Sequence, residues 1–440
     1  MVNYPKYIWA SVSLGLALLL FLHPHFPVYR DLTQIVENDK KIVVLNKPMV
    51  PSTHNGIANS TNSTVEYWPT IDWLESTPKE QGMSSKRLDQ MKEFIIDQQV
   101  DKYLDSVLVI RNGYLVLEMY PSSYDYGFTK IPKYNQNMTH ILHSVTKSFT
   151  SALIGIAIQQ GLIDNITQKV VDFFPGRTIE NLDSRKQNMT LEHLLTMTTG
   201  FEWDEWSYPY TDSRNILIQM INSGNAFQFM LNRPMASNPG EDWVYCTGAS
   251  HLLSAIIKQV TGYNALNFAR DFLFGPLGII SAIWSTDSQG INYGGSELRL
   301  TPRDMAKFGF LFLNNGTWDG QQIVLADWVT NSTKPHFNFN FYGYQWWLNP
   351  LAGLYHASGV YGQEIFVVPN HNLVVVFTGD FKNENPENQL LFNYILPAVT
   401  DGIDLEGGGW ILGFPVIFIG FFSITALLGI ISVVMQKLYP

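Results

Sequence analysis

The chain of 440 residues, 46% of them hydrophobic, is long enough for one large domain or two with a full core. Its formal net charge is −10, and no cluster of Lys and Arg could follow a phosphate backbone, which excludes nucleic acid as an expected partner. The only cysteine, Cys246, excludes an internal disulfide framework, and we expect a small buried side chain there rather than a catalytic thiol.

Residues 8–28 form the first predicted element. The run IWASVSLGLALLLFL carries no charge, and the apolar and proline residues after it extend the segment to Val28. We predict a retained transmembrane anchor, with a cleaved signal peptide as the alternative. The sequence HPHFPVYR that follows lacks the small-residue cleavage site of a signal peptide.

Residues 29–75 mix charge, proline and the polar patch STHNGIANSTNST without a sustained period, which predicts a stalk or linker. The globular domain is predicted over residues 76–403. Sequons for N-glycosylation lie between the two apolar ends of the chain and predict a glycoprotein. They start at Asn59, Asn62, Asn137, Asn165, Asn188, Asn315 and Asn331.

Strands are expected at both ends of this domain. The segment SVLVIRNGYLVLEMY, residues 106–120, breaks at Asn112 and Gly113, which is a strong hairpin signal. EIFVVPN and LVVVFTGD predict a second hairpin around residues 369–372. Helices are expected between the hairpins, one of them ending near Gly200 in LEHLLTMTTG. This order predicts an α+β layout in which the first and last strands share one sheet.

The stretch HSVTKSFTSALIG, residues 143–155, places Ser144 three positions before Lys147 in an apolar run with helical spacing. On one helix the amine would lie close enough to take the hydroxyl proton, and the helix start would favour oxyanion charge. Lysine can act as a base only if burial lowers its pKa. The spacing alone is not decisive, because Ser76 and Lys79 share it by accident, and an ordinary amphipathic helix is the alternative.

Residues 410–435, WILGFPVIFIGFFSITALLGIISVVM, are long and apolar enough to predict a second transmembrane helix. Lys6 and Lys437 both favour cytoplasmic chain ends. The domain between the spans is therefore expected on the extracytoplasmic side of a cell membrane, with the lipid bilayer as a partner of the terminal helices.

Six segments occur in an order that resembles a known family. They are LVIRNGYLVLEMY, HSVTKSFTSALIGIAIQQGLI, MTLEHLLTMTTGFEWDEW, NPGEDWVYCTGASHLLSAII, LRLTPRDMAKFGFLFLNNGTWDG and YHASGVYGQEIFVVP. Together they resemble the serine β-lactamase and penicillin-binding protein superfamily. The most similar branch holds class C β-lactamase-like esterases, aminopeptidases and 6-aminohexanoate-dimer hydrolases. Over residues 80–400 the resemblance implies a β-lactamase/transpeptidase-like fold, an antiparallel sheet flanked by helices plus a helical subdomain, here with N- and C-terminal transmembrane helices.

The resemblance also implies roles for single residues. Ser144 matches the acylated serine, Lys147 its base, and Tyr245 in VYCTGAS the phenol that relays the proton to and from the leaving group. A phenol beside a cationic lysine can have a lowered pKa. The amides of Ser144 and Val360 would form the oxyanion hole. Thr247 stands where relatives often have Asn, which puts that residue's hydrogen bond in doubt.

Ala357, Ser358 and Gly359 occupy the place of the KTG or HxG motif of lactam-acting members. The Lys or His of that motif helps bind a carboxylate, so its absence should weaken recognition of anionic substrates. Ala-Ser-Gly is typical of the nylon-oligomer-hydrolase-like branch. Strand alternation should turn His356 to the opposite face, as a structural or exposed side chain. The residues expected to contact substrate are Thr247, Ala357, Ser358, Gly359 and Trp203, the last in a loop (203–206) that borders the cleft in relatives or is merely held by tryptophans.

These features predict a serine hydrolase that cleaves an ester or amide bond in a small-molecule or cell-surface substrate through an acyl-enzyme, without metal or organic cofactor. His140 and His143 lack a third ligand and are expected on a helix surface. The alternatives are a D-peptidase or β-lactamase, and a catalytically silent surface binding protein. The sequence leaves the leaving group, the acyl chain and the oligomeric state open.

Overall fold

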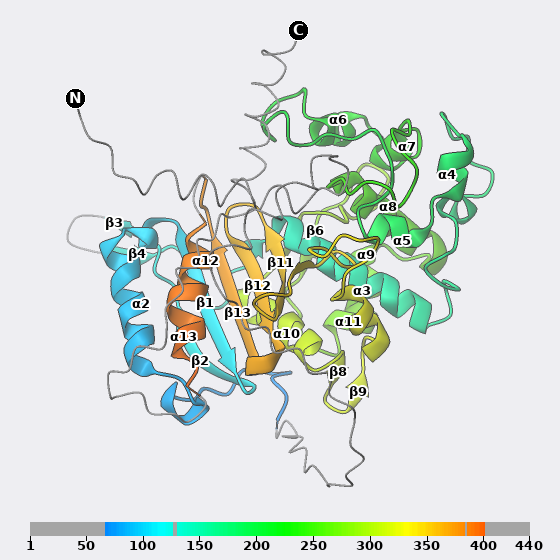
Figure 1. Cartoon of the computed structure of the whole chain (residues 1–440). Helices are drawn as coiled ribbons and strands as arrows, with labels where there is room; N and C mark the ends of the chain where they lie inside the picture. Colours follow the sequence, from blue (N-terminus) through cyan, green and yellow to red (C-terminus); the bar gives the residue numbers. More distant parts are fainter. Residues whose placement is uncertain (1–66, 126–129, 383–384, 401–440) are drawn as a thin grey trace, which may run out of the picture. The chain divides into compact units, whose positions relative to one another are not determined.

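A six-stranded antiparallel sheet organises the domain in the computed structural model, which describes residues 67–125, 130–382 and 385–400 (Figure 1). Its strand order is β10-β11-β12-β13-β1-β2. The strands are β1 (Leu104–Arg111), β2 (Tyr114–Met119), β10 (Trp347–Asn349), β11 (Leu354–Gly359), β12 (Gln363–Val368) and β13 (Leu373–Gly379). Because β1 pairs with β13, the prediction that the first and last strands share one sheet is confirmed.

Both predicted hairpins are present. Asn112 and Gly113 connect β1 and β2 with φ angles of 54° and 86°, the left-handed conformation that a tight two-residue hairpin turn requires. A 3-10 turn, Pro369–His371, and Asn372 with φ of 44° connect β12 and β13. Every residue of β1, β12 and β13 is buried, so these strands form the centre of the core.

Helices cover both faces of the sheet (Figure 1). One face packs against α2 (Ser85–Asp97), α12 (Pro386–Leu390), a π-helical turn (Leu391–Ile395) and α13 (Leu396–Ala398). The other face packs against α3 (Thr146–Gln159) and α10 (Pro302–Leu313), whose Phe149 and Phe308 rings stack with centroids 3.7 Å apart. Helix α3 therefore has one side on the sheet core, and its N-terminus can be held rigidly.

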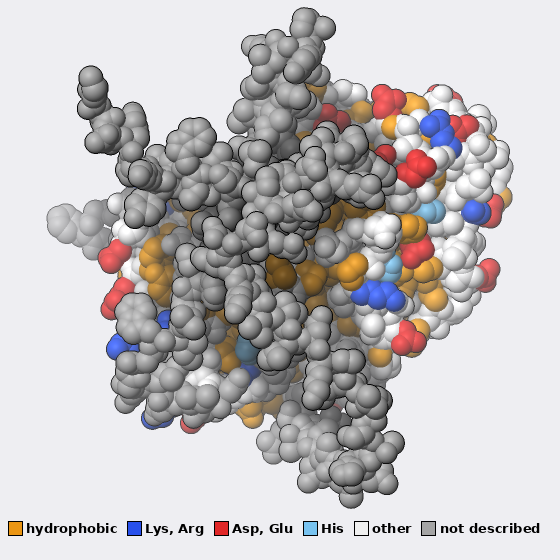
Figure 2. Space-filling view, viewed as in Figure 1, with side chains coloured by type: hydrophobic (Ala, Val, Ile, Leu, Met, Phe, Trp, Pro, Cys, Tyr) orange, Lys and Arg blue, Asp and Glu red, His pale blue; other side chains and the backbone are white. Residues whose placement is uncertain are grey.

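The remaining helices form a second region beside the sheet, in which α8 (Thr247–Thr261) packs against α3, α5 and α7. Charged side chains of both signs are interspersed over its visible surface (Figure 2). Its other helices are α4 (Ser184–Asn188), α5 (Leu191–Leu195), α6 (Ile216–Asn222), α7 (Ala226–Leu231), α9 (Ala265–Ala269) and α11 (Ala326–Ser332). Short strands form three small sheets: β3 (Ser123–Asp125) with β4 (Lys130–Pro132); β5 (His140–Ile141), β7 (Leu298–Leu300) and β6 (Ile283–Trp284); and β8 (Thr317–Trp318) with β9 (Gln321–Gln322).

Helix α5 is shorter than LEHLLTMTTG predicts, because it ends at Leu195 and Met197 adopts a left-handed φ of 61°. Gly200 lies outside the helix, with a φ of 74°. A Cβ atom there would come within 2.4 Å of the Ser237 carbonyl oxygen. Gly200 thus permits a close backbone contact and does not end the helix.

The prediction of N- and C-terminal transmembrane helices is corrected. Among the described residues no helix is both long and apolar enough to cross a membrane. The two segments for which spans were predicted, 8–28 and 410–435, lie outside the described residues, as does most of the predicted stalk. The terminal helices, and with them the bilayer as a partner, therefore find no support in the described part of the chain.

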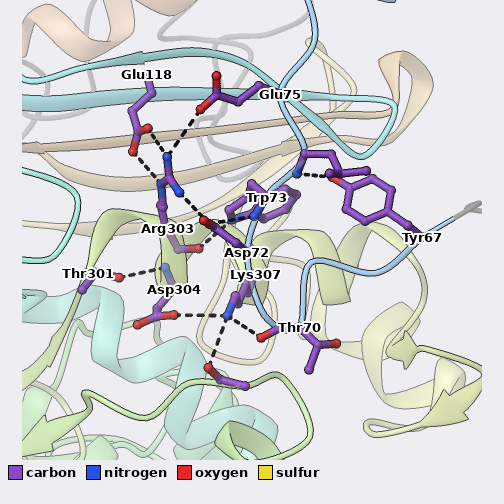
Figure 3. A network of polar contacts seen from close by, with 12 residues as sticks. Tyr67, Thr70, Asp72, Trp73, Glu75, Glu118, Thr301, Arg303, Asp304 and Lys307 are labelled. Atoms are coloured by element: carbon purple, nitrogen blue, oxygen red, sulfur yellow. Dashed lines mark hydrogen bonds and ion pairs between the residues drawn. The ribbon is translucent and has the colours of Figure 1, made fainter.

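Residues 67–75, at the end of the predicted stalk, pack on the domain through a polar network centred on α10 (Figure 3). Arg303 donates to both carboxylate oxygens of Glu118, at 2.9 and 2.6 Å, and to Asp72 at 2.5 Å. One turn later Lys307 donates to the Thr70 carbonyl at 3.1 Å. Trp73, only 4% exposed, donates its indole N–H to the Arg303 carbonyl. This segment is joined to α10 by charge-assisted hydrogen bonds, and Arg303 in turn joins α10 to β2.

Replacing Arg303 with Met should lower the free energy of unfolding by about 2 to 4 kcal/mol, because Glu118 would lose its buried partner. Both side chains of that pair are only 14% exposed. Urea denaturation of the full-length chain measures the change. Arg270→Met, at an exposed position, is the matched control and should stay within about 0.5 kcal/mol of the parent protein. Equal denaturation midpoints for the two variants would show that the network contributes nothing measurable to the free energy of unfolding.

Candidate active site

Ser144 lies in a 3-10 turn, His143–Val145, directly before α3. The helix starts later than the sequence suggests, because His140 and Ile141 pair with β7 as strand β5. His143 has a left-handed φ of 45°, an uncommon conformation for a residue with a side chain, which costs about 1 to 3 kcal/mol and recurs at functional sites. The turn places Ser144 at the N-terminus of α3, and the residue is partly exposed.

Strand β11 approaches this turn closely at Gly359. A Cβ atom there would lie 2.5 Å from the Leu142 carbonyl oxygen and 3.1 Å from the Ser144 amide nitrogen. Only glycine therefore allows the end of β11 to lie against the turn that carries Ser144. Val360, the next residue, follows at the end of the strand.

Lys147 is 2% exposed and points back to Ser144. Its Nζ donates to Ser144 Oγ at 2.9 Å, to Thr247 Oγ1 at 3.1 Å and to the Gly295 carbonyl at 2.9 Å. Burial lowers the pKa of Lys147 to about 8, against the opposing influence of Glu205 and Cys246. The amine thus has the contact and the lowered pKa that a base for Ser144 requires.

Tyr245 comes directly before the N-cap of α8, and the Lys147 Nζ lies 4.8 Å from the centre of its ring. The ring is 5% exposed and is surrounded by Trp206, Trp243 and Trp347, with centroid distances of 5.3, 6.2 and 6.0 Å. Burial raises the pKa of Tyr245 well above its ordinary value, Glu205 adds to this, and the Ser144 hydroxyl acts in the opposite direction. The expectation of a lowered pKa is wrong, because burial of the phenol, together with the negative charge of Glu205, outweighs the opposing influence of Ser144. The phenol of Tyr245 is therefore protonated at neutral pH.

Thr247 connects Lys147 to a buried carboxylate. Its hydroxyl accepts from Lys147 and donates to Glu205 Oε1 at 2.8 Å, while its amide donates to Glu205 Oε2 at 2.9 Å. Glu205 is 1% exposed and also accepts from the Trp203 indole N–H at 2.7 Å and from the Tyr210 hydroxyl at 3.1 Å. Trp203, expected to contact substrate, is thus a buried donor to Glu205.

Glu205 was expected only as a member of the 203–206 loop, without a role of its own, and Gly295 was not expected at the site. Gly295 supplies the carbonyl that accepts from Lys147, and a Cβ atom on it would lie 2.7 Å from Thr247 Cγ2 and 3.2 Å from Lys147 Nζ. The neighbouring carbonyl of Gly294 accepts from Thr150 at 2.7 Å. The only signal for this contact is the Gly-Gly pair in NYGGSEL, which indicates close backbone packing but names no partner.

The Ala-Ser-Gly segment is divided between the two faces of β11. Ala357 is 1% exposed and belongs to the core shared with α3 and α10. Ser358 donates to Glu364 Oε1 at 2.5 Å, and Glu364 Oε2 lies 2.8 Å from His356 Nδ1. Burial raises the pKa of Glu364. His356 therefore has a structural role, as predicted, because it contacts Glu364. The Ser358 hydroxyl bonds to the same carboxylate on that face of the sheet and does not point toward Ser144.

Other titratable candidates are buried. Cys246 is 0% exposed, and burial raises its thiol pKa. His140 lies in strand β5 and not on a helix surface, and burial lowers the pKa of both His140 and His143 to about 4. Within residues 67–125, 130–382 and 385–400, no group of three or more His, Cys, Asp or Glu side chains could hold a metal ion.

Comparison with known proteins places these motifs in context. A family model described as Beta-lactamase matches residues 96–399. A curated relative, 6-aminohexanoate-dimer hydrolase of Paenarthrobacter ureafaciens, is 24% identical over 291 residues, which cover 62% of this chain and 71% of that protein. The structure of EstCE1, a hydrolase with promiscuous acyltransferase activity, is similar with a TM-score of 0.58 and 15% identity, over 73% of this chain and 99% of that one. A family VIII carboxylesterase structure gives a TM-score of 0.57 and 12% identity, over 74% and 98% of the two chains.

Proposed function

The chain belongs to the Beta-lactamase family and is a serine hydrolase, and we propose that it cleaves ester or amide bonds through an acyl-enzyme on Ser144. One observation carries the assignment of Ser144: the Lys147 Nζ, buried and with a lowered pKa, lies 2.9 Å from its hydroxyl. The surface pair Ser76 and Lys79 offers no such environment, since both residues lie outside the core and Ser76 bonds to Glu80.

Acylation begins with the neutral form of Lys147. With a pKa of about 8, roughly one tenth of the amines are neutral at pH 7. The Ser144 Oγ attacks the substrate carbonyl carbon while its proton passes to Nζ. The Thr247 hydroxyl and the Gly295 carbonyl hold the resulting ammonium in place. The negative charge that develops on the substrate oxygen is bound by the amides of Ser144 and Val360.

Tyr245 then supplies the proton for the leaving group. Because its pKa is raised, the phenol is protonated at neutral pH and can donate to the departing oxygen or nitrogen. The proton that Lys147 took from Ser144 then neutralises the phenolate that is left on Tyr245, so both groups regain their starting protonation states. In deacylation the same groups act in reverse, with water in place of the leaving group.

The rim of the site favours an apolar portion of the substrate near Tyr245. Trp206 is 48% exposed although it packs on the Tyr245 ring, and Trp347 on the other side is partly exposed. Aromatic faces open to solvent bind acyl or aromatic groups. An extracytoplasmic location stays a prediction. Glycosylation also stays a prediction, and Asn137, Asn165 and Asn188 have the solvent exposure that it requires.

Labelling with a fluorophosphonate tests the proposal directly. The full-length chain and its Ser144→Ala variant are exposed to the reagent, and intact mass is measured. A single adduct that the variant lacks supports an activated Ser144, and hydrolysis of ester and amide libraries then follows. An adduct with benzylpenicillin at low concentration would instead favour the D-peptidase or β-lactamase alternative. Folded protein that forms no adduct would support a catalytically silent binding protein.

The pH dependence of ester hydrolysis should report on Lys147. We expect kcat/KM to rise about tenfold per pH unit below pH 8 and to level off above it, because only the free enzyme with a neutral amine can react. The group is protonated, and therefore inactive, below its pKa, so the loss is on the acid side. Initial rates between pH 6 and pH 9.5 measure the profile. A flat profile over this range would contradict the role of Lys147 as the base.

A further inference from the structure

A polar cavity of about 300 Å³ lies beside the nucleophile turn. Two of the residues that line it are sequence neighbours of the proposed reacting groups: His143 precedes Ser144, and Tyr361 follows Val360. Their rings meet edge to face, with centroids 5.3 Å apart. The cavity is therefore lined by the sequence neighbours of Ser144 and Val360. It lies at a different place from the aromatic residues around Tyr245.

Arg299 is the distinctive group in this cavity. It lies on β7 opposite Ile141 and is partly exposed. Among the described residues, no carboxylate forms an ion pair with its guanidinium and no side chain or carbonyl accepts a hydrogen bond from it. The contrast with Arg303, which binds Glu118 and Asp72, is direct. The planar fork of an arginine left without a protein partner matches a carboxylate in geometry and charge.

The other charged groups of the cavity leave it mildly cationic. Lys102 and Lys133 line it together with Arg299, against two carboxylates, Asp105 and Asp380. The Asp105 side chain accepts from Ser122 Oγ at 2.9 Å and is buried, so this carboxylate is already engaged. Asp380 is exposed at the end of β13. The two lysines are engaged as well, Lys102 with Gln99 and Lys133 with the Lys102 carbonyl, so the charge that favours an anion here is chiefly that of Arg299.

His140 lines the same cavity as a neutral side chain. The residue is 5% exposed, and its Nε2 has no hydrogen-bond partner within the described part of the chain. Its Nδ1 lies 3.8 Å from Asp105, too far for a hydrogen bond, so the neutral ring can carry its proton on Nε2. Because Nε2 itself is shielded from solvent, His140 shapes the wall of the cavity and makes no direct contact to a ligand.

We propose that this cavity binds a carboxylate at one end of the substrate, with Arg299 as the principal ligand. The substrate class is then an ester or amide that carries a free carboxylate at one end and an apolar group at the other. This assignment rests on the proposed hydrolase function. Arg299 would then provide the cation for anionic substrates. Lactam-acting relatives have a Lys or His for this purpose at the position of Ala357 in this chain.

Matched ester pairs test the inference. The first pair is the para-nitrophenyl monoester of glutaric acid and its neutral methyl ester, with the carboxylate on the acyl side. The second is meta-carboxyphenyl butyrate and its methyl ester, with the carboxylate on the leaving group. Only the pair whose carboxylate reaches the cavity, on the acyl group or on the leaving group, should respond to Arg299→Met. For that pair, kcat/KM for the charged ester should fall by roughly 10- to 100-fold, and kcat/KM for the neutral ester should change less than twofold. Arg299→Lys should recover part of the loss, and Lys86→Met, exposed on α2, is the control for lost charge.

A binding measurement separates this proposal from the hydrolase proposal. Glutarate is titrated calorimetrically into full-length Ser144→Ala protein, with and without Arg299→Met. Saturable binding that Arg299→Met abolishes supports the cavity even if no ester is hydrolysed, in which case only the hydrolase proposal fails. Equal losses on charged and neutral esters, or no preference for charged esters together with no glutarate binding, would overturn the carboxylate site while leaving hydrolysis intact.

Discussion

Replacing Lys147 with Met is expected to lower kcat for ester hydrolysis by about 10²- to 10⁴-fold, the usual size of a general base contribution. Methionine is close to lysine in volume and suits the buried site, but it cannot take the Ser144 proton. The Gly295 carbonyl and the Thr247 hydroxyl would lose their shared donor, so a moderate fall in stability should accompany the loss of activity.

Lys92→Met on the exposed surface of α2 provides the matched control for this experiment, and its activity should be unchanged. Active-site titration with the fluorophosphonate separates the two effects of Lys147→Met, because a folded variant that labels slowly has lost activation and not structure. Activity of Lys147→Met within tenfold of the parent protein would mean that another group takes the proton.

Replacing Glu205 with Gln is expected to shift the pH profile of kcat/KM toward lower pH. The negative charge of Glu205 raises the pKa of Lys147, so without it the pKa should fall below about 8 and the plateau should begin earlier. Glu205 also accepts from the Trp203 indole, the Tyr210 hydroxyl and both donors of Thr247. The amide group of glutamine would face some of these donors with its own N–H, which should cost about 1 to 3 kcal/mol of stability.

Glu205 is a positioning residue in this scheme, since it acts through Thr247 on Lys147, and we expect a fall in kcat of roughly 10-fold with little change in KM. The exposed neighbour Glu202 provides the control variant, Glu202→Gln, which should leave both the profile and the stability unchanged. A merely structural role would lower activity without moving the apparent pKa. A profile that moves toward higher pH would contradict the electrostatic argument.

The parts of the fold that were predictable have local causes. Asn112 and Gly113 determine a hairpin by their own backbone preferences. Ser144 and Lys147 become neighbours through the local geometry of a 3-10 turn and the first turn of α3. Glu205 and Gly295 were not predictable in the same way. Glu205 bonds to Thr247 across 42 residues of sequence, and Lys147 bonds to Gly295 across 148. No local pattern encodes which carbonyl or carboxylate tertiary packing brings to the amine.

The wrong expectation for Tyr245 has a physical cause of the same kind. Its pKa depends on two opposing influences, the attraction of a nearby ammonium and the cost of burying a phenolate. The sequence shows that Lys147 and Tyr245 belong to one site, but it does not show that three tryptophans enclose the ring. In Trp203 the same limit applies, because only the folded loop directs its indole toward Glu205 and away from the opening.

The pairing of β1 with β13 determines when the enzyme can form during synthesis. Ser106 and Thr378, whose hydroxyls lie 2.6 Å apart across these strands, are separated by 272 residues. Contacts so distant along the chain close late, because the loop between them must be ordered first. During synthesis on the ribosome, the edge of β1 stays unpaired until β13, the last strand of this sheet along the chain, has been made. Gly359 reaches the Ser144 turn through the same sheet, so nascent chains that lack β13 should have no hydrolase activity.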